Sequence, residues 1–180
     1  MRFTELGLQG AFVIDIEPVE DDRGFFARCW SRDEFAARGL VDELLECNLS
    51  FNRRRGTLRG LHYQAAPKQQ AKLVRCTHGS VYDVIVDLRA GSPTQHRWEA
   101  LEITAENRRM VYVPKGFAHG FQTLTDQTEV AYQMSDNYAP THARGIRWDD
   151  PILAVAWPIP PLSISERDRS HPNMEASWTN

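Results

Sequence analysis

Residues 57–76 read TLRGLHYQAAPKQQAKLVRC and contain two strand-like segments joined by a proline-containing turn. Three side chains in this stretch, Arg59, His62 and Lys72, can bind an anion, move a proton and stabilise an oxyanion. Side chains alternate between the two faces of a strand, so His62 should share the core-facing side with Leu58. A polar group that points into an apolar interior must be hydrogen-bonded or take part in chemistry. The stretch leaves both roles open for His62.

Short strands separated by turns fill most of the chain beyond Asn48. The clearest covers residues 81–88, where apolar side chains alternate with Asp83 and Asp87. One or two short strands are predicted within residues 6–17, and further strands at residues 25–30, 98–104, 109–113, 117–124 and 128–135. Many short strands with few helical signals are typical of an all-β antiparallel sandwich or barrel.

One helix is predicted at residues 32–38. Ser31 and Glu34 have the spacing of a capping box, in which the two side chains satisfy free amides at the helix start, and Gly39 ends the helix.

The C-terminal part of the chain is rich in proline beyond Trp148. Proline prevents regular structure, so this segment is predicted to wrap the barrel and to end in a helical turn near residues 163–168. The residues after Pro172 are expected to be mobile.

Length and composition indicate a single domain spanning residues 1–180. The net charge of -3 gives no electrostatic reason to expect nucleic acid or an anionic membrane as a partner. Three cysteines, Cys29, Cys47 and Cys76, are odd in number and lack CxxC spacing, which argues against a disulfide framework and a zinc site. We therefore expect a cytoplasmic protein.

Residues 114–121, PKGFAHGF, have the spacing of the second cupin motif, Pro-x-Gly-x-x-His, which ends here at His119. In metal cupins this histidine is a ligand, and a His-x-His pair and a glutamate supply the others. The comparable place here reads His62-Tyr63-Gln64, without a second histidine. Two nitrogens without a placed carboxylate match a divalent first-row metal poorly, so a barrel without a metal is expected.

Separated motifs run in one order through nearly the whole chain. They are residues 22–26, 48–50, 58–64, 72–74, 83–89, 91–94, 114–121, 147–151 and 165–168, together with Tyr132 and Tyr138. With these motifs the chain resembles the dTDP-4-dehydrorhamnose 3,5-epimerase family of nucleotide-sugar cupins. The resemblance implies a cupin-type double-stranded β-helix, or jelly-roll barrel, with short peripheral helices.

The resemblance also implies a reaction, the inversion of carbons that flank the ketone of a 4-keto-6-deoxy sugar. It makes His62 the base, Tyr132 the acid on the opposite face, and Lys72 the group that stabilises the enolate oxygen. Asp168 would hold the second nitrogen of His62, and Asp83 is a second candidate for that partner from its position on a strand. The resemblance implies no metal and no redox cofactor.

Substrate binding is implied for a further set of residues. Arginine suits a diphosphate because its planar fork makes paired bonds to phosphate oxygens. Phe26 and Arg23 would reach into a neighbouring subunit's site, which implies a homodimer formed by exchange of N-terminal strands. Tyr138 permits a double epimerisation without requiring it. The residues expected to handle diphosphate, sugar and nucleoside are Arg23, Asn48, Arg59 and His119.

Each site residue has a plainer interpretation when it is taken alone. A single histidine in a strand is more often structural, tyrosines in a strand are usually sheet packing, and Lys72 and Asp168 would be a surface charge and a local cap. The resemblance reverses these interpretations for the motif residues only. Four histidines without motif support are expected on the surface or in loops: His78, His96, His142 and His171.

Four positions depart from the family pattern. Arg28, Cys47, Gln133 and Ala143 stand where glutamate, glutamine, lysine and glutamate are usual, and they are expected near the nucleotide or the subunit contact. None of them is the base, the acid or the oxyanion group, so the resemblance implies the chemistry better than the identity of the nucleotide. Losing two carboxylates and gaining an arginine makes the pocket more positive, which could suit a different base, a different sugar or a re-paired contact.

The main hypothesis is a cofactor-independent epimerase of a nucleotide-linked 4-keto-6-deoxyhexose, dTDP-linked by the resemblance, acting at C3, C5 or both in deoxysugar biosynthesis. A single-centre epimerase or ketoisomerase on a related sugar is one alternative. A sugar-nucleotide-binding cupin without activity and a metal-dependent cupin are the others.

Overall fold

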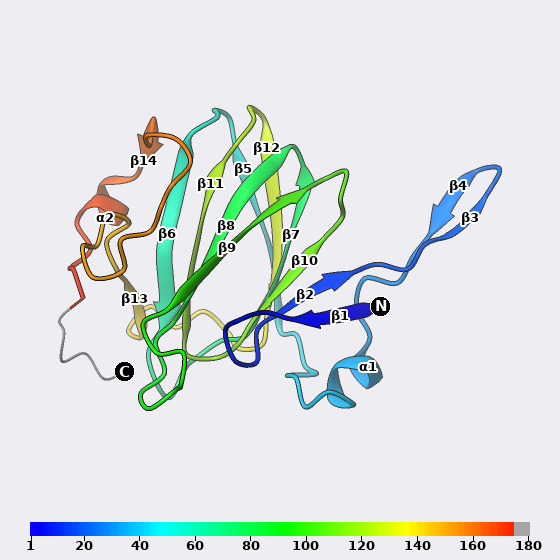
Figure 1. The fold of residues 1–180 in the computed structure, drawn as a ribbon, viewed down its shortest axis with the longest axis horizontal. Coiled ribbons are helices and arrows are strands. Elements are labelled where there is room, and N and C mark those ends of the chain that lie inside the picture. The colour runs from blue at the N-terminus through cyan, green and yellow to red at the C-terminus, as the bar shows by residue number, and fades with distance from the viewer. Residues whose placement is uncertain (175–180) are drawn as a thin grey trace.

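The computed structural model describes residues 1–174, and within them the strands form two facing sheets and a separate hairpin (Figure 1). The first sheet has the order β1-β2-β10-β7-β12-β5, and the second has the order β13-β6-β11-β8-β9, with β14 parallel to β6. The first sheet contains β1 (Arg2–Glu5), β2 (Phe12–Asp15), β10 (Met110–Val113), β7 (Lys72–His78), β12 (Thr128–Met134) and β5 (Glu46–Asn52). The second contains β13 (Ala143–Gly145), β6 (Thr57–Gln64), β11 (Phe117–Thr123), β8 (Ser80–Asp87) and β9 (Trp98–Thr104), with β14 (Ser163–Ile164) beside it.

The main core lies between the two sheets, where the inward-facing residues of both meet. Val74, Val111 and Val130 of the first sheet pack against residues of the second such as Ile85 and Phe121. Burial of these side chains is the principal stabilising term, roughly 1.5–3 kcal/mol for each large apolar side chain. The all-β, cupin-type jelly roll expected from the sequence is confirmed.

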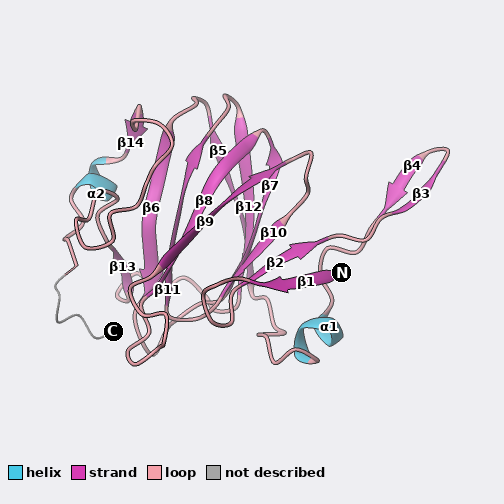
Figure 2. Cartoon of the chain, in the orientation of Figure 1, coloured by secondary structure: helices cyan, strands magenta, loops and turns pink. Residues whose placement is uncertain are grey.

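The C-terminal segment covers the outer face of the second sheet. Leu153, Val155 and Trp157 join a cluster with Val84 and other residues of that face. Figure 2 shows that β14 and the helix α2 (Glu166–Arg169) lie beside β6. The predicted helical turn at 163–168 was therefore placed too early, because Ser163 and Ile164 pair with β6 and Ser165 caps the helix.

The chain end departs from the expectation of mobility after Pro172. Met174 is buried, and its amide donates to Asp150 Oδ2 over 2.6 Å. Residues 175–180 lie outside the described part of the chain.

The first helix, α1 (Arg32–Ala36), confirms the helix predicted there, and Gly39 follows with a positive φ. Its buried Phe35 packs on the outer face of the first sheet, against Tyr112. The predicted capping box is wrong, since the Ser31 side chain makes no cap hydrogen bond. Glu34 binds the N-terminal amine instead, at 3.1 Å.

The prediction of one or two short strands over residues 6–17 is confirmed in part, because β2 lies within that range whereas β1 precedes it. β1 and β2 pair as a hairpin whose turn lies in that range, closed by the Leu6 amide donating to the Ala11 carbonyl over 2.9 Å. The turn directs Leu8 into the main core, where it is fully buried.

A second hairpin, β3 (Val19–Asp21) and β4 (Gly24–Phe26), projects away from the sandwich (Figure 1). Val19 is 72% and Phe26 78% exposed. The strand predicted at 25–30 ends at Phe26, because Cys29 and Trp30 turn back to pack beside α1.

The strands β6 and β11 carry an irregularity that positions His62. In their register Arg59 opposes Phe121 and His62 opposes His119, so β6 has one extra residue between these pairs. Directly opposed residues share a face of the sheet, and a bulge shifts the alternation. Arg59, rather than Leu58 as predicted, therefore lies on the same face as His62.

Two glycines allow the close approach of these strands. A Cβ on Gly60 would lie 2.5 Å from the Gly120 Cα, and one on Gly120 would lie 2.7 Å from the Arg59 carbonyl oxygen. Only residues without a side chain fit this crossing beside His62.

Among residues 1–174, neither helix has the length or the apolar content needed to cross a membrane.

Candidate active site

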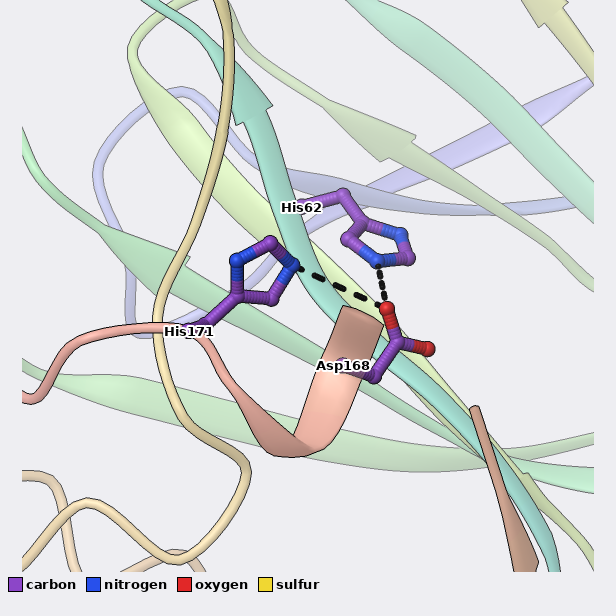
Figure 3. A group of neighbouring side chains, drawn as sticks. All are labelled: His62, Asp168 and His171. Atoms are coloured by element: carbon purple, nitrogen blue, oxygen red, sulfur yellow. Dashed lines mark hydrogen bonds and ion pairs between the residues drawn. The ribbon is translucent and has the colours of Figure 1, made fainter. Parts of the chain in front are cut away.

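His62 of β6 forms a short hydrogen bond with Asp168 of α2. His62 Nε2 lies 2.7 Å from Asp168 Oδ1, and the carboxylate also accepts from the Gly60 amide at 3.4 Å (Figure 3). Burial works to raise the pKa of Asp168, but the bonds from His62 and Gly60 outweigh it and lower the pKa below its usual value. Asp168 is therefore ionised at neutral pH and holds one nitrogen of His62.

A second imidazole, that of His171, lies beside this pair. Its Nε2 is 3.7 Å from Asp168 Oδ1, and its ring meets the His62 ring edge to face at 5.7 Å between centroids (Figure 3). His171 lies in the loop that follows α2, as expected, but it is not a surface residue, since its side chain is only 12% exposed. Burial, followed by the charge of His62, lowers the pKa of His171.

Asp83 does not hold His62, which corrects the second prediction for that partner. It lies on β8 and binds His119 of β11, with 2.8 Å between His119 Nε2 and Asp83 Oδ2. Strand pairing explains the choice, since β11 lies between β6 and β8 and separates Asp83 from His62. The neighbouring strands β6 and β11 therefore each carry an imidazole that is paired with a carboxylate, His62 with Asp168 of α2 and His119 with Asp83 of β8.

Lys72 and Tyr132 approach His62 from the opposite sheet. All three residues line both of two adjoining cavities, of about 210 and 150 Å³. Lys72 Nζ donates to the His62 carbonyl oxygen over 3.3 Å, and burial lowers the pKa of Lys72 to about 8, against an opposing effect of Asp83. The cavities thus bring together an imidazole, an ammonium group and a phenol.

The other residues predicted for the site fall into two groups. Asn48 and Tyr138 line the larger cavity, and Arg59 and His119 line the smaller one. Arg59 is oriented by Asn52, whose Oδ1 accepts from its Nε at 2.7 Å. Arg23 and Phe26 are not brought to these cavities, since they lie at the projecting hairpin.

Sequence reasoning missed several residues that line the larger cavity. Arg144 follows the departure Ala143, and Arg167 directly precedes Asp168 in a motif that had already been identified. The position of Arg167 beside Asp168 in the sequence could have identified it as a residue of the site. The remaining residues of the lining are Tyr63, Gln64, Gln70 and Met134.

The departures from the family pattern lie at different places. Ala143 lines the larger cavity. Cys47 and Gln133 pair on the outer side of β5 and β12, 3.7 Å apart between sulfur and amide nitrogen. Arg28 binds Glu34 of α1 at 3.3 Å.

This arrangement defines a class of protein: a cupin-type sandwich that carries groups for acid–base chemistry between its sheets. The family model described as dTDP-4-dehydrorhamnose 3,5-epimerase matches residues 5–176. The chain belongs to the dTDP-4-dehydrorhamnose 3,5-epimerase family, whose members are isomerases.

Individual relatives are similar over almost the whole chain. A dTDP-4-dehydrorhamnose 3,5-epimerase of Sinorhizobium fredii is 40% identical over 179 residues, 97% of this chain and 90% of the relative. A dTDP-4-dehydrorhamnose 3-epimerase of Streptomyces niveus is 40% identical over 170 residues, 94% of this chain and 82% of the relative. The solved structure of the Bacillus anthracis 3,5-epimerase with TDP and PPi bound has a TM-score of 0.92, 38% identity, and coverage of 96% of this chain and 99% of that one.

Proposed function

We propose that the protein epimerises a dTDP-linked 4-keto-6-deoxyhexose at C3, C5 or both, by proton transfer between His62, the sugar and Tyr132. The observation that carries this proposal is that His62 from one sheet, and Lys72 and Tyr132 from the other, line the same two cavities. The family membership and the nucleotide bound to the Bacillus anthracis relative support the substrate class.

The first step is removal of a proton from a carbon beside the ketone. Nε2 of His62 is engaged by Asp168, so Nδ1 is the nitrogen that accepts this proton. Asp168 fixes that tautomer and stabilises the imidazolium that forms. The electron pair of the broken C–H bond moves into an enolate.

The enolate oxygen needs a positive partner. Lys72 supplies an ammonium group, because a pKa of about 8 leaves it mostly charged at neutral pH. A charge held in a cavity with little water stabilises an oxyanion more than the same charge would in solution.

Inversion requires that the new proton arrive from the other face of the sugar. Tyr132 lies on β12, across the sandwich from His62, and its phenol can donate to the carbanion carbon. Arg59 and Asn48 bind the diphosphate and nucleoside, and His119, held by Asp83, binds the sugar. These steps require only proton transfers, so no metal or redox cofactor is proposed.

Solvent exchange tests the proposal. The protein is incubated with dTDP-4-keto-6-deoxyglucose in deuterated water, and NMR then locates the deuterium. We expect incorporation at C3, C5 or both with inversion, its loss in His62→Ala, and no change in His78→Ala, which alters an exposed imidazole. Failure to exchange any nucleotide-linked 4-keto sugar rejects the proposal, and tight dTDP binding without exchange would instead indicate a binding protein.

The number of inverted centres is read from the same spectra. The Sinorhizobium relative is named a 3,5-epimerase and the Streptomyces relative a 3-epimerase, at equal identity to this chain. Tyr138 lines the larger cavity and is 53% exposed, so it is placed to contact the sugar. Exchange at one carbon alone would identify a single-centre epimerase.

A cytoplasmic homodimer is part of the proposal. β5 is an edge strand with Leu49 66% and Phe51 49% exposed, and an exposed apolar edge is a typical association surface. The projecting β3–β4 hairpin offers Arg23 and Phe26 to a second copy of the chain. The three free cysteines suit a reducing compartment.

A further inference from the structure

The imidazole of His171 has no part in the proposed epimerisation. It is nevertheless directed at the carboxylate of Asp168, which orients the proposed base His62 (Figure 3). Its Nε2 is buried and has no hydrogen-bond partner within residues 1–174. A buried polar nitrogen without a partner is unfavourable and needs an explanation.

The backbone leaves a place for this ring. Gly145 of β13 pairs directly with His62 of β6, and a Cβ at position 145 would overlap the His171 ring. The strand opposite His62 thus leaves room for a second imidazole, which is held against the first.

We propose that Nε2 of His62, Oδ1 of Asp168 and Nε2 of His171 form a binding site for Zn²⁺ or a similar divalent ion, and that binding there inhibits the enzyme. Nε2 of His62 and Nε2 of His171 lie 2.7 and 3.7 Å from Asp168 Oδ1. One ligand atom from each of the three residues lies within 4.8 Å of the other two. Zinc holds nitrogen and oxygen ligands at about 2.0–2.2 Å, so tetrahedral neighbours are roughly 3.3 Å apart, and each side chain need move by only about an ångström or less.

The donor set determines which ions fit. Two imidazoles and one carboxylate suit zinc and other ions that prefer nitrogen, whereas magnesium needs more oxygen ligands. The nearby cations oppose binding: Arg167 acts on His171, and the Lys72 ammonium lies 3.3 Å from the His62 carbonyl oxygen. The carboxylate of Asp168 supplies the negative charge that offsets these cations, and the two imidazole nitrogens complete the ligand set.

Inhibition follows from the tautomer of His62, and this part of the inference rests on the proposed function. A metal on Nε2 uses the lone pair of that atom, so the single ring proton of the neutral imidazole moves to Nδ1. Nδ1 is the nitrogen that must accept the substrate proton. The base is therefore disabled without a change in the residues proposed to hold the nucleotide, and kcat should fall while dTDP still binds.

Titration of ZnCl₂ into chelator-treated protein, followed by calorimetry, tests the site. We expect one tight zinc site per chain, inhibition over the same concentration range, and neither effect with MgCl₂. His171→Phe keeps a ring against Gly145 without its nitrogens, and should lower zinc affinity by about 100-fold or more, since even supporting residues contribute 10–100-fold. Its activity in chelator should persist. His78→Phe, which removes an exposed imidazole on β7, is the matched control and should bind zinc as the parent does.

Equal zinc affinity in the parent and in His171→Phe, or no zinc binding to the parent, would overturn the inference. If thermal melting shows that His171→Phe is unfolded, His171→Leu carries the same comparison. Binding of Co²⁺, followed by its visible absorption, gives a readout that needs no epimerase activity. Zinc binding without inhibition would overturn only the inhibitory part, while a lack of any epimerase activity would count against the proposed function and leave the binding result standing.

Discussion

His62 Nε2 lies 2.7 Å from Asp168 Oδ1, although the two residues are 106 positions apart along the chain. The contact joins the longest strand at the cavity to a helix of four residues near the chain end. Ser165 starts that helix by accepting from the Asp168 amide at 3.1 Å, so the carboxylate is aimed by a local cap as well as by the bond to His62.

Asp168→Asn should lower kcat by about 10²–10⁴-fold, because the amide can no longer stabilise the imidazolium or enforce its tautomer. The rate is measured from solvent deuterium incorporation, with thermal melting to confirm folding. Asp149→Asn is the matched control, since Asp149 makes an exposed ion pair with Arg147 at 2.7 Å. It should leave kcat unchanged and shift stability by less than about 1 kcal/mol. A kcat of Asp168→Asn equal to that of the parent would remove Asp168 from the mechanism.

The rate should decline as the pH rises through about 8, where Lys72 loses its proton. A neutral amine cannot stabilise the enolate, so Lys72→Met should have no measurable turnover at any pH. The check is a profile of kcat/KM between pH 6 and 10. A rate that stays constant to pH 10 would show that the Lys72 charge is not needed.

Lys72 should also lower the free energy of unfolding. Its pKa falls from 10.5 in the unfolded chain to about 8, so between these pH values the folded state binds fewer protons and stability rises with pH. At neutral pH, Lys72→Met should raise the free energy of unfolding by roughly 1–3 kcal/mol, because a buried charge is removed. Denaturant unfolding measures this, with exposed Lys115→Met as a control that should change little. A less stable Lys72→Met protein would contradict the assignment.

Tyr132→Phe should separate exchange from inversion. The ring still packs against the main core, but the proton donor is lost. We expect His62 to keep exchanging deuterium into the substrate while the epimer forms about 10²-fold or more slowly. Tyr112→Phe provides the comparison: its hydroxyl accepts from the Val41 amide at 3.1 Å, so the change should cost about 1 kcal/mol of stability without altering the rate. Undiminished inversion by Tyr132→Phe would assign the acid to another group.

The β3–β4 hairpin should act in the partner's cavity. Arg23→Ala and His62→Ala would then each be impaired alone, but a mixture exchanged through mild denaturation should regain activity. In a mixed dimer one cavity receives an intact His62 together with an intact Arg23 from the other chain. The deuterium assay measures the activity of the mixture, and the molar mass in solution shows whether dimers form. A mixture no more active than the average of its two components would refute strand exchange.

Much of the fold could be predicted because it depends on local pattern. Alternating apolar residues place β8 and β9 within a residue of their observed limits. The helix α1 ends at Ala36, two residues before its predicted limit, and Gly39 lies in the turn that follows. Side chains alternate between the two faces of a strand, so the local sequence pattern shows which face is buried without information from other strands. Where one extra residue enters β6, that rule failed, and Arg59 took the place predicted for Leu58.

The sequence by itself indicated residues whose side chains can transfer a proton and, through ordered motifs, the family to which the chain belongs. It did not determine which groups meet. Both Asp83 and Asp168 were candidates for His62, and only the position of β11 between β6 and β8 assigns Asp83 to His119. His171 carried no signal at all, because its place depends on a glycine 26 positions earlier that lies opposite His62. Such contacts between residues far apart in the sequence depend on which strands pair and on the space left between side chains. The local sequence pattern contains neither kind of information.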